Sequence, residues 1–218
     1  MNYDSIDILY RSRKTLLTLL EKDGYNTVPF SKFSPKEILE MLKGGEKAFQ
    51  MDLTRPEEAA VGGITNCRVV VSLAKLKLRL SGWISKVNDP EDDMYVDPAT
   101  TELVVVLLQE PVIPAFHSVA IQQYARHKLR VRFFEARHIV NNPLDSFLVP
   151  RHEKVKEEEI AALLKNLHCT SRSKLPIIRF HEDAIARILG LVPGDIVKIY
   201  RASPTALVYE PYYRVCVP

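Results

Sequence analysis

Four of the 27 acidic residues of this sequence lie close together in one short segment, VNDPEDDMYVDP, namely Asp89, Glu91, Asp92 and Asp93. Carboxylate oxygens are the ligands that hard cations such as Mg²⁺ prefer, so this cluster could in principle serve phosphodiester cleavage. Pro and Asp are also the ordinary residues of a solvated turn. Many metal nucleases further need a lysine two positions after a carboxylate on one strand face, and no Asp or Glu here has one. We therefore predict an acidic turn and no catalytic residues.

Other metal and cofactor signatures are equally sparse. The six histidines never occur four residues apart, and the neighbouring pair His168 and Cys169 cannot complete a tetrahedral zinc site. Cys67, Cys169 and Cys216 lie far apart without a C-x-x-C motif, which is typical of reduced packing residues. The phosphate-loop, dinucleotide, zinc-hydrolase and serine-hydrolase motifs are missing. We expect no metal and no cofactor.

Two basic clusters could bind phosphates. The first comprises Arg11, Arg13 and Lys14, which could alternatively brace the segment that carries them. The second lies in residues 126–137, where five Lys or Arg face one acid, Glu135. Its members are Arg126, His127, Lys128, Arg130, Arg132 and Arg137. Counterion release draws such patches to nucleic acids, and a solvated basic surface is the alternative.

The composition restricts the class of protein. The 218 residues are 46% hydrophobic and 26% charged, a globular mixture that excludes collagen, coiled coil and general disorder. A net charge of +3 is too small for the whole chain to act as a polycation. The apolar run 103–108 is too short to span a bilayer, and the acids of MNYDSIDILYRSRK do not fit a secretory signal. We expect a soluble intracellular protein without a membrane partner.

The elements that position these residues begin with two helices. Leu9, Leu16 and Leu20 recur at helical spacing before Gly24. In SPKEILEMLKGG, Ser34 and Glu37 predict a capping box on a second helix. Residues 46–66 lack periodicity and predict a loop, whereas VVVSLAKLKLRLSGW alternates as a half-buried strand would. A buried strand over 102–108, a helix over 114–129 and the strand RVRFF complete a mixed α/β domain, residues 1–145.

Residues 146–218 predict a second, small α+β domain. RHEKVKEEE begins a helix that turns Val155, Ile160, Leu163, Leu164 and Leu167 inward. The strand KLPIIRF, a helix ending at Gly190, a Pro193–Gly194 turn and the strands DIVKIYR and YYRVCV follow, the last two joined by the turn ASPTAL. Strands that flank a small helix can close a core of their own.

The C-terminal sequence LPIIRFHEDAIARILGLVPGDIVKIYRASPTALVYEPYYRV resembles the fifth-largest subunit shared by eukaryotic nuclear RNA polymerases, whose C-terminal module corresponds to a small component of the archaeal polymerase. LYRSRKTLLTLLEKDGY is similar to the opening helix of that family. This chain differs at Ala184, Ala202 and Leu207, where the family commonly has Pro, Pro and Gly, and in its Glu110–Ala115 loop. It looks like a divergent member, such as a paralogue assigned to one polymerase or a copy from a distant lineage or a virus.

The resemblance implies a non-catalytic polymerase subunit. Residues 1–145 would form a jaw domain of nuclease-like α/β topology near downstream DNA, with Arg11, Arg13 and Lys14 as nucleic-acid contacts. Residues 146–218 would be the assembly domain that docks on the largest subunit, alongside other polymerase subunits. Its partner-binding residues would be Pro176, Arg187, Gly190, Gly194, Lys198, Arg201, Ser203, Thr205, Tyr213 and Arg214. For Ser203, Thr205 and Tyr213 the alternative is turn formation and core closure.

The resemblance also implies a location in the nucleus, in the nucleolus for a subunit dedicated to the ribosomal-RNA polymerase, or in the cytoplasm for a viral copy. Two other functions stay open from the residues alone. The 126–137 cluster could belong to a free-standing nucleic-acid-binding module, and the acidic turn could belong to a metal-dependent nuclease.

Overall fold

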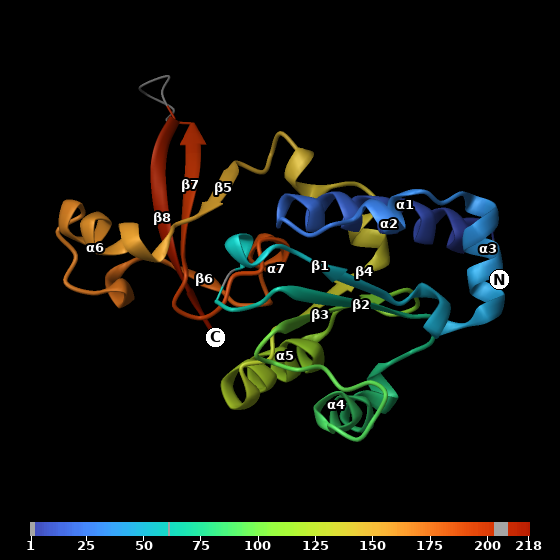
Figure 1. Cartoon of the computed structure of the whole chain (residues 1–218). Helices are drawn as coiled ribbons and strands as arrows, with labels where there is room; N and C mark the ends of the chain where they lie inside the picture. The colour runs from blue at the N-terminus through green and yellow to red at the C-terminus, as the bar shows by residue number, and fades with distance from the viewer. Residues whose placement is uncertain (1–2, 61, 203–208) are drawn as a thin grey trace. The chain divides into compact units, whose positions relative to one another are not determined.

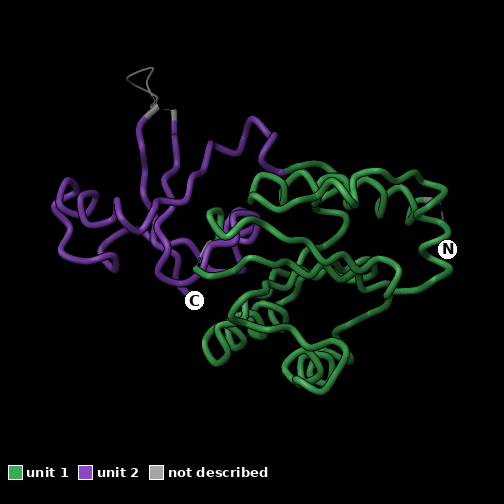
Figure 2. Tube along the Cα trace, in the orientation of Figure 1, with its two compact units in different colours: residues 1–142 green, residues 143–218 purple. Residues whose placement is uncertain are grey.

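The chain forms two compact units in a computed structural model, residues 1–142 and residues 143–218 (Figure 2). The structure describes residues 3–60, 62–202 and 209–218. The domain boundary predicted after residue 145 lies close to this division, which follows Asn142. Each unit has its own four-stranded sheet, so the mixed α/β fold class is confirmed.

The sheet of the first unit follows the order β1-β2-β3-β4 (Figure 1). Its strands are β1 Met51–Thr54, β2 Asn66–Ser72, β3 Thr101–Leu107 and β4 Val131–Glu135. β2, β3 and β4 run parallel, and β1 pairs antiparallel with β2. β3 lies inside the sheet and its residues 103–107 are all buried, which confirms the strand predicted from the continuous apolar run.

Helices cover both faces of this sheet. They are α1 Tyr3–Lys22, α2 Val28–Ser31, α3 Pro35–Gly44, α4 Leu80–Asn88 and α5 Pro114–His127. Figure 1 shows α1 on one side of the strands and α4 and α5 on the other. Leu16 of α1 lies with Met51 and Val69 around one small apolar cavity, and the rings of Phe116 and Phe133 lie 4.9 Å apart on the α5 side. The two faces together form the core of the unit.

The predicted start of α3 is confirmed in atomic detail. The Ser34 hydroxyl accepts the Glu37 N–H at 3.4 Å, and the Glu37 carboxylate accepts the Ser34 N–H at 2.6 Å. This reciprocal capping box satisfies two amides that the helix itself leaves without partners.

Two predictions for the middle of the first unit are wrong. Residues 46–66 are not a loop throughout, because Met51 and Leu53 are buried in β1, a strand too short to give a clear period. The strand expected to run on past Ser72 ends there, and α4 begins at Leu80. The Glu110 carboxylate accepts the N–H groups of Leu76 and Lys77 and thereby turns the chain. A contact over more than 30 residues cannot be read from a local pattern.

The second unit contains a sheet of order β5-β7-β8-β6. Its strands are β5 Arg151–Lys154, β6 Ile177–Arg179, β7 Ile196–Ala202 and β8 Tyr209–Val217, and its α-helices are α6 Glu157–Asn166 and α7 Ala184–Ile188. The turn predicted over residues 202–207 lies almost wholly outside the described residues. Val155, Ile160, Leu175, Ile196 and Val215 form one core cluster, against which Leu163 and Leu164 pack.

Two details of α6 differ from the prediction. RHEK was expected to open the helix, but it forms β5, whose residues pair with β7 from Arg151 opposite Tyr200 to Lys154 opposite Val197. Backbone pairing with a distant strand outweighs the local charge pattern. Leu167 does not turn inward, because the helix ends at Asn166 and the Leu167 side chain stays 39% exposed.

Short 3-10 helices connect these elements, at Glu46–Phe49, Glu57–Ala59, Lys77–Arg79, Ala136–Ile139, Pro143–Asp145 and Arg172–Lys174. Within the described part of the chain, no helix combines the length and the apolar character that crossing a bilayer requires.

Candidate partner-binding and nucleic-acid surfaces

The predicted partner-binding residues fall into three groups. Ser203 and Thr205 lie outside the described residues. Lys198, Arg201, Tyr213 and Arg214 occupy the paired strands β7 and β8, where Lys198 stands opposite Tyr213. Pro176, Arg187, Gly190 and Gly194 lie on the connections and the helix around these strands.

One face of the β7–β8 pair carries an aromatic ring between two arginines. The guanidinium of Arg201 lies 4.6 Å from the centre of the Tyr212 ring, and that of Arg214 lies 5.5 Å from the same ring. Arg214 Nη1 also donates to the carbonyl oxygen of Ile177 at 3.2 Å. Cation–π stacking holds such planar groups in fixed directions. Their remaining N–H donors suit the carboxylates and carbonyl oxygens of a partner protein.

The opposite face repeats this arrangement around Tyr200. Its ring has Lys198 Nζ at 4.8 Å and the Arg151 guanidinium at 5.5 Å from its centre. The Tyr200 hydroxyl donates to the Glu153 carboxylate at 2.8 Å, and this hydrogen bond lowers the pKa of Glu153 below its usual range. Both faces of the hairpin thus present polar groups whose directions are set by an aromatic ring.

Gly190 and Gly194 have roles in the fold itself. Gly190 has φ +58° and Gly194 has φ +99°, in the region that favours glycine. The Gly194 N–H donates to the Cys216 carbonyl at 2.9 Å, and Arg172 Nη1 donates to the Gly194 carbonyl at 3.0 Å. These bonds attach the turn before β7 to the end of β8, so Gly194 shapes the hairpin from its base.

Pro176 and Arg187 flank the same small core. The Pro176 carbonyl accepts the Val215 N–H at 2.8 Å, and Arg187 lies half-buried on α7. The Asp183 side chain accepts the N–H groups of Ile185 and Ala186 at the start of α7.

An exposed apolar segment, which sequence reasoning missed, lies beside the hairpin. Phe147 is 94% exposed and Leu148 is 76% exposed. Together with residues 149–151, Tyr200 and Arg201 they line an open pocket of about 820 Å³. Large apolar side chains that remain this exposed are typical of interaction surfaces. The run FLVP, next to a predicted domain boundary, was the available signal.

The basic residues of α1 do not form one equivalent set. Arg11 donates to Asn141 Oδ1 at 2.7 Å and forms an ion pair of 3.6 Å with Asp7. Arg13 lies 5.1 Å from the centre of the Phe33 ring, and burial lowers its pKa. Lys14 is exposed and has no ion pair among the described residues. Arg11 and Arg13 thus each contact another side chain of the first unit, whereas Lys14 forms no ion pair with a described residue.

The basic cluster of residues 126–137 is not continuous. Arg132 is 6% exposed and lies in a buried network, with Nη2 2.8 Å from Glu102 Oε1 and Nη1 3.2 Å from Asp23 Oδ2. Its pKa is raised by these two carboxylates, which outweigh the opposing effect of burial. Arg137 is exposed and lies 3.8 Å from Asp4. The assignment of Arg132 to a basic surface is therefore wrong, because its charge is neutralised inside the unit.

The acidic segment forms the predicted turns. The carboxylates of Asp89, Asp92 and Asp97 each accept the backbone N–H two residues further on. In the ranges that the structure describes, no group of three His, Cys, Asp or Glu side chains could hold a metal ion. Burial raises the pKa of the Cys216 thiol to about 12 and that of Cys67 as well, which suits protonated packing residues.

Known proteins match this chain most clearly in its second unit. Residues 141–216 match the family model described as RNA polymerase Rpb5, C-terminal domain. A relative named DNA-directed RNA polymerase subunit Rpo5, from Pyrococcus horikoshii, is 50% identical over 70 residues, which cover 32% of this chain and 82% of the relative. This chain belongs to the Rpb5/Rpo5 family. The resemblance found in the sequence is thus confirmed, and the chain is a non-catalytic subunit of a DNA-directed RNA polymerase.

The Rpb5/Rpo5 likeness extends beyond the second unit. The Rpo5 subunit of Thermococcus kodakarensis is 43% identical over 76 residues, or 35% of this chain and 89% of that protein. A Dictyostelium discoideum relative, DNA-directed RNA polymerases I, II, and III subunit rpabc1, is 29% identical over 159 residues, or 63% of this chain and 79% of the relative. An alignment of 159 residues must include part of the first unit, because residues 143–218 are too few to supply it.

Proposed function

We propose that the second unit joins this chain to the largest subunit of an RNA polymerase and that the first unit forms part of the jaw beside downstream DNA. The lengths of the alignments with archaeal relatives support this proposal. They align only with a segment of the size of the second unit, yet this segment makes up 82–89% of their own length. A module that is nearly the whole of an archaeal polymerase subunit is the natural assembly element of a longer chain.

The β7–β8 hairpin is the proposed docking surface. Arg201 and Arg214 offer donors fixed against Tyr212, and the exposed Phe147 and Leu148 offer apolar area next to Arg201. Aromatic residues and arginines are enriched among the few residues that contribute most of the binding energy at protein–protein interfaces. Ser203 and Thr205 remain proposed contacts in the segment that joins the two strands.

Separate expression of the two units tests the assembly role. We expect tagged residues 143–218 to co-purify with the largest polymerase subunit, because the family match and the docking surface both lie there. We expect tagged residues 1–142 not to do so. Recovery of the polymerase through the first unit alone would contradict the proposal.

A double substitution on the hairpin tests whether this surface is responsible for the binding. Arg201→Ala combined with Arg214→Ala should abolish co-purification of the full chain while lowering its free energy of unfolding by only about 1–2 kcal/mol, through the loss of the two cation–π contacts with Tyr212. Arg179→Ala is the matched control, since Arg179 is an exposed arginine on β6 that forms an ion pair of 3.5 Å with its near neighbour Glu182. Equal loss with the control would show that the effect does not come from the hairpin surface.

Single substitutions can distinguish two roles of the basic residues on α1, contact with DNA and bracing of the helix against the rest of the first unit. We expect Arg13→Ala to lower the free energy of unfolding by about 1 kcal/mol, because it removes packing and a cation–π contact with Phe33. We expect Lys14→Ala to change stability by less than about 0.5 kcal/mol. If Lys14 binds a phosphate in the assembled polymerase, its loss should lower the salt dependence of DNA binding by about one unit. A reduced salt slope with normal stability for Arg13→Ala would overturn the bracing role.

In a eukaryotic cell we propose a nuclear location, on the ground of the Dictyostelium relative, and fluorescence microscopy of the tagged chain tests it. A nucleolar signal would indicate a chain dedicated to one polymerase. The nuclease alternative receives no support from the comparisons.

A further inference from the structure

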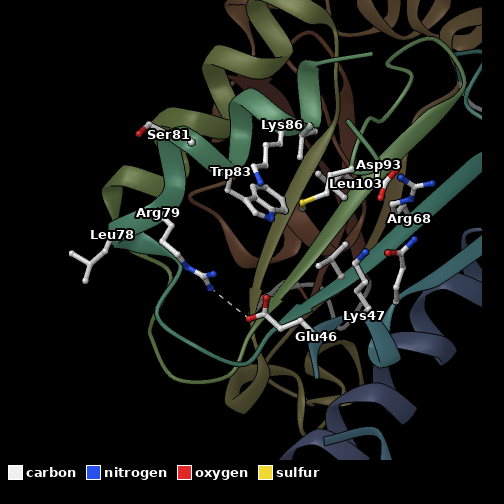
Figure 3. A pocket seen from close by; sticks show the side chains of 15 residues that line it. Glu46, Lys47, Arg68, Leu78, Arg79, Ser81, Trp83, Lys86, Asp93 and Leu103 are labelled. Carbon is white, nitrogen blue, oxygen red and sulfur yellow. Dashed lines mark ion pairs between the residues drawn. The ribbon is translucent and has the colours of Figure 1, made fainter. Parts of the chain in front are cut away.

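A pocket of about 630 Å³ lies in the first unit, on the sheet face that α4 covers only in part. Val70 of β2 and Leu103 of β3 contribute apolar lining from the sheet, and Trp83 and Val87 contribute it from α4. Figure 3 shows the Trp83 ring directed toward the middle of this space. The volume and the aromatic lining are typical of a site that receives one or two large side chains.

The charged residues of the pocket leave an excess of positive charge. Lys47, Arg68, Arg79 and Lys86 line it with only Glu46 and Asp93 as acids. Arg68 is held by Asp52 at 2.7 Å, and Arg79 lies 3.6 Å from Glu46. Lys47 and Lys86 form no ion pair with any described residue. Lys47 and Lys86, which line the pocket together with Trp83, therefore have no carboxylate of the described chain paired with their charges.

Gly82 keeps this wall of the pocket open. It lies inside α4, where glycine is less favourable than alanine. A Cβ at this position would meet nothing within 4 Å, so internal packing does not require glycine here. Leu78 at the edge of the pocket is 86% exposed and points away from the other lining side chains in Figure 3. At the opening of the pocket, Leu78 therefore leaves apolar surface exposed to solvent. Gly82 leaves the adjoining position of α4 without a side chain.

We infer that this pocket binds a short acidic segment of a partner protein, with a large apolar side chain inserted against Trp83 and carboxylates placed at Lys47 and Lys86. The two acids of the lining favour a peptide over a polyphosphate, because Asp93 and Glu46 would repel a dense cluster of negative charge. A peptide can instead turn backbone N–H groups toward Asp93. Leu78 extends the apolar contact beyond the mouth of the pocket. This site lies in the first unit and does not depend on how the second unit assembles.

Trp83 is the one tryptophan of the chain, so its fluorescence reports on this pocket alone. The probe is the acetylated peptide Asp-Glu-Asp-Leu-Phe-Asp-Glu-Leu-Asp-Glu, titrated into the full chain. We expect a saturable change in Trp83 emission. A peptide with Lys in place of every acid, and one with Ser in place of Leu and Phe, should each bind at least about tenfold more weakly. Equal binding of all three peptides, or no response to the acidic probe up to millimolar concentration, would overturn the proposal.

Variants connect the signal to the named residues. Lys47→Glu and Lys86→Glu should each weaken binding by about fivefold, and Gly82→Phe should block it by occupying the opening. Lys36→Glu on α3 makes the same charge change outside the pocket and should have no effect. Ser85→Phe is the control for a new aromatic group on α4, since Ser85 does not line the pocket. Far-ultraviolet circular dichroism of each variant establishes folding, and equal loss with the two controls would contradict the assigned site.

Discussion

Replacement of Arg132 by methionine is expected to lower the free energy of unfolding of the first unit by about 3–5 kcal/mol. The guanidinium lies 2.8 Å from Glu102 and 3.2 Å from Asp23, and the Tyr25 hydroxyl donates to the same Glu102 oxygen at 2.7 Å. Methionine fills much of the volume but leaves the Glu102 carboxylate, which is 5% exposed, without its cation. A buried charge that loses its partner is among the most destabilising changes in a protein.

Urea unfolding followed through Trp83 fluorescence measures this effect, because Trp83 lies in the first unit. Asp23→Asn is the matched comparison. Burial raises the pKa of Asp23 despite the opposing effect of Arg132, so its ionised form is already disfavoured in the folded state. Removing that charge should cost less than about 2 kcal/mol. A larger loss for Asp23→Asn than for Arg132→Met would contradict this account of the network.

The loss in free energy of unfolding that Arg132→Met causes should depend on pH. Without the guanidinium, which lowers the pKa of Asp23, that pKa rises further above its ordinary value. A raised carboxyl pKa gives stability that is complete below the unfolded value near ~3.9 and is lost as the pH rises through the folded pKa. The difference from the parent protein should therefore narrow as the pH falls from neutral toward the folded-state pKa of Asp23. A constant difference would mean that Asp23 stays ionised throughout.

Gly194→Val is expected to destabilise the second unit by about 1–3 kcal/mol. Gly194 has φ +99°, and a Cβ there would meet nothing within 4 Å, so the penalty comes from the backbone conformation and not from a clash. The turn is anchored to the end of β8 by the bond from the Gly194 N–H to the Cys216 carbonyl. Strain at this point should therefore loosen both strands of the hairpin.

Amide hydrogen exchange of the full chain locates this effect. Peptides from β7 and β8 should exchange faster in Gly194→Val, and peptides from β3 in the first unit should not. Gly82→Ala is the control, since this glycine substitution is expected to raise stability instead of lowering it. Gly82 lies in a helix with open space around it, so alanine should stabilise α4 by up to about 1 kcal/mol. Unchanged exchange in β7 and β8 would show that the turn accepts a β-branched residue.

Features with local physical causes could be predicted from the residues alone. The capping box of Ser34 and Glu37 and the turns around Asp89 and Asp92 involve groups two or three residues apart, so their patterns suffice. The apolar run 103–107 indicated a buried strand because its composition excludes an exposed face. The family resemblance of the C-terminal sequence was likewise visible in the residues, and the comparisons confirmed it.

The state of the charged residues, in contrast, depends on tertiary packing. Arg132 and Asp23 are 109 positions apart in the chain, and Arg13 of α1 meets Phe33 from the connection between α2 and α3. Whether a guanidinium is a surface cation or a buried partner depends on desolvation and on carboxylates brought in from distant segments, which no local pattern specifies. The same holds for the strand β5, which exists because β7 supplies its hydrogen-bond partners. The pocket around Trp83 likewise arises where α4 leaves part of the sheet uncovered, since a cavity is a property of packing between elements and not of any single one of them.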